Sequence, residues 1–191
     1  MPIEAYVRAN QLVLAYSASE AWPIQLDARW IARTGLAGEP VATWDLIVSV
    51  HTDLLDSRPE LGVVSTLGCS AGLRLLDAAG RFAELDLPTE QTAVIGPAGG
   101  PGCVLFRFPK GQFSYAEMVH PADFHHDEVL TLKSNESCTA KISHRLFVES
   151  LEKGVVLRAR IRGVVLPRDA DCRLAADAYW AFAAADPPLG A

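Results

Sequence analysis

The stretch KISHRLFVESLEKGVVLRARIRGVVL, residues 141–166, carries the longest alternation of side-chain character in the chain. The alternation breaks only at Lys153-Gly154, and Gly154 can take the positive φ that a tight hairpin turn requires. We therefore predict that 141–166 forms a β-hairpin with one apolar face and one basic face. The apolar face is expected to lie in the core and consists of Leu146, Val148, Leu157, Ala159 and Ile161.

The basic face of this predicted hairpin is the first candidate for a binding surface. Its members are Arg145, Phe147, Arg158, Arg160 and Arg162. Guanidinium groups bind carboxylates and phosphates through two parallel hydrogen bonds, and Arg160 over Phe147 would form a cation–π pair. We interpret this face as a contact surface for an acidic ligand or partner. The alternative is an ordinary solvated strand face, whose charges keep the sheet soluble.

Segments with the pattern of strands recur at short intervals through the rest of the chain. Residues 24–30 and 44–50 alternate apolar and polar side chains, which is typical of strands with one buried face. Residues 73–77 and 81–87 flank Gly80 and predict a second hairpin, with this glycine in the left-handed conformation. Because no helices alternate with these strands, we predict a mainly β protein, either an antiparallel β-sandwich or a strongly curved two-sheet fold.

The sequence contains one convincing helical pattern, at the C-terminus, from Asp169 or Asp171 to Ala185. An aspartate at the start and two prolines beyond the end are the expected boundary signals. The predicted apolar face consists of Leu174, Ala178, Ala181, Phe182 and Ala185. Trp180 falls on the opposite side and is a candidate subunit contact, should the protein form a homo-oligomer.

Length and composition limit the class of protein. With 191 residues, 50% of them hydrophobic, the chain is expected to form a single β-rich domain, 1–191, with the Gly/Pro-rich stretch 96–102 as a candidate hinge between two packed halves. A net charge of −6 argues against a nucleic-acid partner. No apolar run is long enough to span a membrane and no signal-peptide pattern opens the chain, so we expect a cytoplasmic protein. Arginine outnumbers lysine 13 to 4, which points to a GC-rich bacterial genome.

A histidine-rich segment, HPADFHHDE at residues 120–128, is a candidate metal site. Imidazole and carboxylate groups suit zinc, iron or manganese, and the candidate ligands are His120, Asp123, His125, His126 and Glu128. A strand would place alternate members on opposite faces, so only some of them could share one ion. The spacing fits no metal-binding motif, and the alternative interpretation is a polar surface loop interrupted by proline.

The segment Gly68-Cys69-Ser70-Ala71-Gly72 matches G-x-S-x-G, the turn that exposes the nucleophilic serine of α/β-hydrolases. That motif requires a strand before the serine and a helix after it. Here the residues that follow have the pattern of a strand, so the context favours a glycine-rich turn.

Three functional hypotheses follow from these patterns. The first is a binding or interaction module that uses the basic face, with an unidentified protein or an anionic small molecule as its partner. The second is a metal-dependent enzyme or metal-binding protein centred on 120–128. The third is a serine hydrolase that uses Ser70. The sequence specifies no cofactor and does not decide whether the protein is an enzyme.

Overall fold

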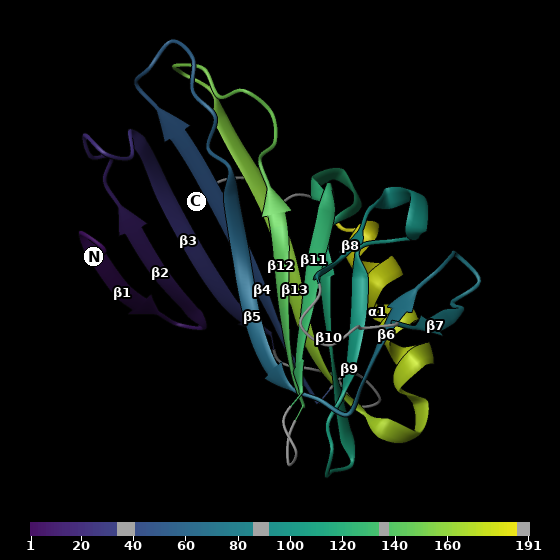
Figure 1. Ribbon diagram of the computed structural model, residues 1–191. Coiled ribbons are helices and arrows are strands. Elements are labelled where there is room, and N and C mark those ends of the chain that lie inside the picture. The colour runs from purple at the N-terminus through teal and green to yellow at the C-terminus, as the bar shows by residue number, and fades with distance from the viewer. Residues whose placement is uncertain (34–40, 86–91, 134–137, 187–191) are drawn as a thin grey trace.

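The computed structural model describes residues 1–33, 41–85, 92–133 and 138–186, and these residues form three layers (Figure 1). A nine-stranded antiparallel sheet lies in the middle. A four-stranded antiparallel sheet covers part of one face, and a C-terminal α-helix packs on the other. The predicted antiparallel two-sheet β fold with one C-terminal helix is confirmed.

The larger sheet has the strand order β1-β2-β3-β4-β13-β10-β9-β6-β7. Its strands are β1 (Glu4–Arg8), β2 (Gln11–Tyr16), β3 (Ile24–Arg33), β4 (Ala42–Thr52), β6 (Ala71–Leu75), β7 (Phe82–Glu84), β9 (Cys103–Arg107), β10 (Phe113–Val119) and β13 (Val156–Pro167). The smaller sheet has the order β5-β12-β11-β8. Its strands are β5 (Leu61–Gly68), β8 (Thr92–Ile95), β11 (His126–Lys133) and β12 (Cys138–Leu146). In the described ranges three short 3-10 helices and one α-helix accompany the sheets: η1 (Pro97–Gly99), η2 (Pro121–Asp123), η3 (Arg168–Ala170) and α1 (Asp171–Ala183).

The hairpin predicted over 141–166 is wrong, because its two arms belong to different sheets. β12 pairs with β5 and β11 in the smaller sheet, whereas β13 pairs with β4 and β10 in the larger one. Gly154 does have a positive φ of 85°, but the segment around it carries the chain from one sheet to the other. Most of the predicted apolar row is still core: Leu146, Ala159 and Ile161 are buried, and Val148 is 54% exposed. Alternation therefore identified the buried faces and missed the pairing.

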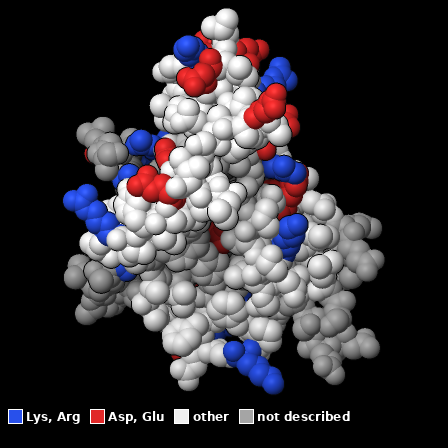
Figure 2. Space-filling view, turned by 90° about the vertical axis from the view of Figure 1, so that its left-hand side faces the viewer, with Lys and Arg blue, Asp and Glu red and all other residues white. Residues whose placement is uncertain are grey.

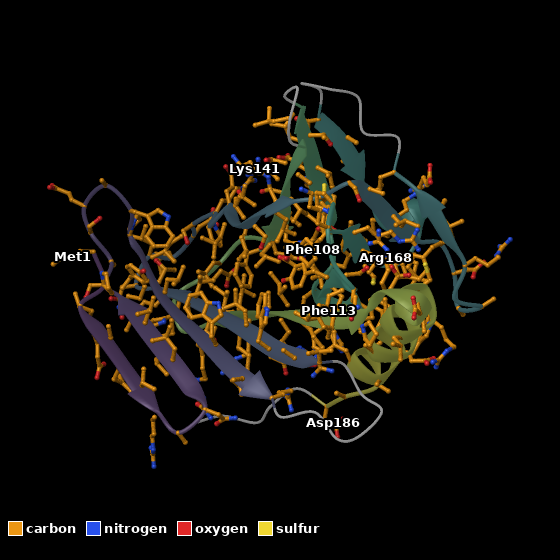
Figure 3. All side chains as sticks on the ribbon, turned by 90° about the horizontal axis from the view of Figure 1, so that it is seen from below. Met1, Phe108, Phe113, Lys141, Arg168 and Asp186 are labelled. Atoms are coloured by element: carbon orange, nitrogen blue, oxygen red, sulfur yellow. The ribbon has the colours of Figure 1, made fainter. Side chains whose placement is uncertain are left out.

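Most of the core lies between the two sheets. One part joins the inner faces of β4 and β13, through Leu46 and Ile161, to Leu146 of the smaller sheet. Another joins Phe106 of β9 to Ile142 of β12. Figure 3 views the molecule from below and shows side chains filling the space between the sheets, with α1 against the far face of the larger one. The sandwich is therefore closed by ordinary apolar burial.

The C-terminal helix is confirmed within two residues of its predicted end, but its buried face differs from the prediction. The buried apolar side chains are Ala175, Ala176, Tyr179 and Phe182, whereas Ala181 is exposed. They pack on the outer face of β9, β10 and β13, against Leu105, Ala116 and Val164. Trp180 is 36% exposed and lies edge-on against Tyr179. Its role as a subunit contact stays a prediction.

The glycine-rich stretch 96–102 joins β8 of the smaller sheet to β9 of the larger one through η1. Gly100 has a φ of 125°, and a Cβ there would come within 2.4 Å of the carbonyl oxygen of Leu75, so no other residue fits this backbone. Its predicted role as a hinge stays a prediction. The hairpin around Gly80 is confirmed as β6 and β7 with a φ of 75° at the glycine; its predicted end at Leu87 lies outside the described residues. Within the same ranges, no helix has the length and apolar character of a membrane span.

Candidate functional site

A polar groove of about 550 Å³ lies on the outer face of the larger sheet, the face turned away from the smaller sheet. We call it the open groove. Its lining side chains come from alternate positions of five neighbouring strands: Glu4, Tyr6, Gln11, Val13, Ala15, Asp27, Arg29, Ile31, Ile47, Ser49, His51, Val156 and Arg158. A volume of this size matches that of sites for small organic ligands.

The strand register places the polar side chains of the open groove in rows across the sheet. Asp27 of β3 lies directly opposite Ser49 of β4, which lies opposite Arg158 of β13. The Nε of Arg158 donates a hydrogen bond of 3.2 Å to the hydroxyl of Ser49. His51 is two residues beyond Ser49, so it is a diagonal neighbour of Asp27 on the same face. One short stretch of the groove is therefore surrounded by four polar groups: a carboxylate, a hydroxyl, an imidazole and a guanidinium.

The charges of the open groove are balanced. Two carboxylates, Glu4 and Asp27, accompany two guanidinium groups, Arg29 and Arg158. Figure 2 looks onto the side of the molecule that carries β1, and there acidic and basic side chains are interspersed without a patch of one sign. Between the polar groups the floor is apolar, with side chains such as Ile47 and Val156. The groove thus offers hydrogen-bond donors, acceptors and apolar contacts together, and its net charge favours a neutral ligand.

The row of arginines predicted on one hairpin face is divided among three environments. Arg158 lines the open groove. Arg145 lies on the smaller sheet, where its guanidinium donates two hydrogen bonds, of 3.2 and 3.0 Å, to the carboxylate of Glu128. Phe147 is buried, with a φ of 56°. Of the five predicted binding residues, the structure thus brings one into the groove; a role for the others in binding stays a prediction.

Arg160 and Arg162 are not solvated, contrary to the interpretation of this face as a wet surface. Arg162 donates hydrogen bonds of 2.6 and 3.0 Å to the two carboxylate oxygens of Asp45 and lies 4.5 Å from the ring centre of Phe182. Arg160 is 8% exposed and bonds to Asp123 through both its backbone N–H and its Nε, at 3.0 and 3.2 Å. The cation–π contact thus joins Arg162 to Phe182 in place of the predicted pair, because α1 covers this end of β13.

The histidine-rich segment 120–128 does not gather its side chains at one point. His120 is buried, and its Nδ1 lies 2.7 Å from the Nη2 of Arg160. Burial, together with the positive charge of Arg160, lowers the pKa of His120. His125 lies 3.4 Å from Glu149, and His126 lies 3.8 Å from Glu128. Among the described residues, no three His, Cys, Asp or Glu side chains are grouped so as to hold a metal ion. The metal hypothesis stays a prediction that metal analysis of the purified protein would test.

Ser70 lies in an exposed turn between β5 and β6, so a strand follows it where the hydrolase motif needs a helix. Its hydroxyl donates a hydrogen bond of 3.1 Å to the backbone carbonyl of Arg107. The turn therefore lacks the local geometry of a nucleophile elbow.

Sequence reasoning missed a polar cluster buried between the sheets. The imidazole of His144 lies between two carboxylates, with its Nδ1 at 2.7 Å from Asp127 and its Nε2 at 2.8 Å from Glu117. Ser65 and Tyr115 donate further hydrogen bonds to Glu117, at 2.7 and 2.9 Å. The cluster joins β10 of the larger sheet to β5, β11 and β12 of the smaller one.

The electrostatics of this buried cluster favour an ion triad. Burial alone would lower the pKa of His144, but the neighbouring carboxylates of Asp127 and Glu117 raise it to about 10. Burial opposes ionisation of Glu117, yet hydrogen bonds from His144, Ser65 and Tyr115 hold the pKa of this carboxyl below its usual range. His144 and Glu117 are 0% exposed, so a substrate cannot reach them. The triad joins the two sheets, whereas the open groove is accessible to a ligand.

Comparisons with known proteins address the fold. No protein-family model and no curated protein sequence matches the chain. A candidate aldose 1-epimerase from Klebsiella pneumoniae superposes with a TM-score of 0.58, 9% identity and coverage of 95% of this chain and 58% of that one. A candidate mutarotase from Salmonella typhimurium superposes with a TM-score of 0.54 and 12% identity, over 88% of this chain and 65% of that one. An α-galactosidase from Geobacillus stearothermophilus superposes with a TM-score of 0.52 and 10% identity, over 87% of this chain and 26% of that one. This chain spans 58% of the length of the first epimerase and about a quarter of the galactosidase. At this level of identity the likeness concerns architecture alone, and the chain shares the β-sandwich fold of these three structures.

Proposed function

We propose that this protein binds a neutral carbohydrate in the open groove. The observation that carries the proposal is the charge-balanced row of Asp27, Ser49 and Arg158, set beside apolar side chains in the open groove. A sugar presents hydroxyl groups that both donate and accept hydrogen bonds around C–H surfaces that are apolar. Carboxylate, hydroxyl and guanidinium groups match the first feature, and Ile47, Val156 and Tyr6 match the second. The fold shared with candidate epimerases and a galactosidase agrees with this ligand class.

The arrangement of Asp27 and His51 favours a second candidate function, the interconversion of sugar anomers. That reaction needs one group to remove the proton of the anomeric hydroxyl and another to protonate the ring oxygen, and then the reverse. Diagonal neighbours on adjacent strands lie about 7–8 Å apart, which leaves room for one sugar ring between the two side chains. Asp27 would serve as the base and His51 as the acid.

Binding is tested by calorimetric titration of the protein with D-galactose, D-glucose and short oligosaccharides. We expect saturable binding to the wild type and a loss of about tenfold or more for Asp27→Asn, because the sugar hydroxyl then donates to a neutral amide oxygen in place of a charged carboxylate. Asp53→Asn is the matched control, since Asp53 is exposed and lies outside the groove. Equal affinities for the wild type and Asp27→Asn would contradict the proposal.

Catalysis is tested separately by polarimetry of freshly dissolved α-D-glucose and α-D-galactose. We expect the wild type to accelerate the decay of optical rotation, and His51→Gln to slow it while sugar binding persists. If the wild type binds sugar without accelerating the decay, the protein is a carbohydrate-binding domain and the epimerase function is rejected.

A further inference from the structure

β1 is an exposed edge strand without proline, lysine or a bulge. It is the first strand of the larger sheet, pairs only with β2 in the described part of the chain, and is exposed at all five residues. Figure 1 shows it along the outer left side of the molecule. Natural edge strands are commonly blunted by proline, by lysine or by a bulge. The segment EAYVR contains no lysine or proline, and its register with β2 is unbroken.

We propose that β1 pairs in antiparallel orientation with β1 of a second copy of this chain, about a two-fold axis at Tyr6. In this register Glu4 lies opposite Arg8 of the second copy, and Arg8 lies opposite its Glu4. Ala5 and Val7 face each other in the same way, and the two Tyr6 side chains meet at the axis. Opposite charges and aromatic pairs directly across an antiparallel ladder are favourable. A shift by two residues would lose both ion pairs.

The charged residues of β1 are available for this contact. Neither Glu4 nor Arg8 takes part in an ion pair or side-chain hydrogen bond within the described ranges. Among the other edges there, β7 has three residues and β8 has four. The edge strand β5, LGVVSTLG, is longer but uncharged, so nothing in it selects one register. β1 is therefore the edge whose sequence is complementary to itself.

An apolar row next to β1 supports the same contact. Val7 lies opposite Leu12, and Leu12 lies opposite Trp30, which packs against the core between the sheets. The smaller sheet does not extend over this end of the larger one, so Val7 is 73% exposed and Leu12 39%. Pairing would place Val7 beside Ala5 of the second copy and remove part of this row from water.

The pairing also has a consequence for the opposite face. Glu4 and Tyr6 line the outer end of the open groove. Arg8 shares their face, so Arg8 of the second copy would stand at the rim, and the two grooves would meet across the axis. The proposal itself rests on the edge strand alone and does not depend on the ligand of the groove.

Sedimentation velocity over a range of protein concentrations at low salt tests the pairing. We expect the wild type to approach twice the monomer mass as its concentration rises. Glu4→Arg and Arg8→Glu should each weaken association by about tenfold, because like charges then face each other at two symmetric positions. An equimolar mixture of the two variants should associate again, since every residue 4 then faces an opposite charge. The double variant Glu4→Arg with Arg8→Glu should also associate.

Matched controls separate this register from general surface effects. Glu152→Arg and Arg58→Glu make the same charge changes at exposed positions outside β1 and should associate like the wild type. Higher salt should weaken association, because the paired charges are exposed. A wild type that stays monomeric at every concentration would overturn the proposal. So would a mixture of the two single variants that associates no better than either alone, since that would show contact through another surface.

Discussion

The outer face of the nine-stranded sheet is covered at one end and open at the other. Under α1 lies a covered region, in which Leu105, Ala116 and Val164 pack against the helix and are at most 1% exposed. Over β1 to β4 and the start of β13 the same face forms the open groove, whose floor carries Asp27 and Arg158. Both regions belong to one continuous sheet, so the difference comes from a single helix of 13 residues. Apolar side chains are buried where the helix covers this face, and the polar side chains of the open groove stay accessible where it does not.

Strand β13 crosses the boundary between the two regions. Arg158, Arg160 and Arg162 alternate along it and point to the same face. Arg158 lies in the open groove, whereas the other two are held by Asp123 and Asp45 at the edge of the covered region. Residue type and alternation are identical for the three arginines. The difference comes from what covers each of them, because η2 supplies Asp123 to Arg160 and α1 places Phe182 against Arg162.

The largest effect is expected from placing a charge in the covered region. Ala116→Asp would bury an unpaired carboxylate among apolar side chains, and the chain should fail to fold. Ser49→Asp adds the same group to the open groove, where water solvates it and Arg158 on one side offsets Asp27 on the other. Circular dichroism and size-exclusion chromatography should show native structure for the second variant alone. Two equally folded variants would mean that α1 does not seal the sheet.

Next in size is the loss of a carboxylate from each region. Asp45→Ala leaves Arg162 nearly buried without its partner, and we expect the free energy of unfolding to fall by about 3 kcal/mol. Asp27→Ala removes a carboxylate from the open groove and should cost less than about 0.5 kcal/mol. Urea unfolding followed by tryptophan fluorescence measures both. If the loss for Asp45→Ala is as small as the loss for Asp27→Ala, the ion pair between Asp45 and Arg162 adds no stability.

A smaller effect concerns the pH dependence of helix docking. Burial alone would raise the pKa of Asp171, but hydrogen bonds from Arg107 and Ser114 hold it below its usual range. A pKa that is lower in the folded than in the unfolded state means that ionised Asp171 stabilises the fold fully above about pH 4, and that this stability is lost as the pH falls through the folded pKa.

Asp171→Asn should therefore unfold at a lower temperature than the wild type at neutral pH, and the difference should shrink as the solution is acidified. Asp177→Asn, which alters an exposed pair with Arg173 on the same helix, should differ little from the wild type at any pH. A gap between wild type and Asp171→Asn that stays constant with pH would contradict the assignment. Calorimetric scans between neutral and acidic pH give the measurement.

The smallest effect on stability is expected at Arg158. Truncation to alanine should change the free energy of unfolding by less than about 0.5 kcal/mol, because the residue is exposed in the groove. The same variant should bind the carbohydrate found by titration less tightly, because Arg158 closes the row of Asp27 and Ser49. A variant that loses stability without losing affinity would assign Arg158 to the scaffold.

Much of the fold was predictable because burial leaves a period in the sequence. The alternation over 44–50 located β4, and the aspartate and prolines around 171–186 located α1. Pairing was not predictable, because alternation states which face a strand buries and not which strand lies beside it. β12 and β13 are close in sequence and have the same alternation of apolar and polar residues, because both bury one face in the same core. That shared alternation does not mean that they pair with each other.

The candidate site was harder to predict than the fold. Asp27 and Ser49 alternate on strands that sequence patterns identified, yet the register that sets them side by side depends on tertiary pairing. The conspicuous histidines of 120–128 drew attention because they are dense in sequence, and the structure disperses them. His144, which lies alone in the sequence, is the imidazole held between two carboxylates. The alternating polar residues of β3 and β4 did indicate that one face of each strand meets solvent. The sequence did not show that this face forms a groove, because that depends on where α1 packs.

The central place of β13 in the larger sheet determines when the protein can fold. Its neighbours β4 and β10 are both made earlier by the ribosome, and the contact of Arg162 with Asp45 spans 117 positions of the chain. Until β13 emerges, both neighbours expose an unpaired edge to other chains. High contact order of this kind slows folding to roughly milliseconds to seconds. We expect the nascent chain to depend on chaperones that shield these edges until β13 completes the sheet.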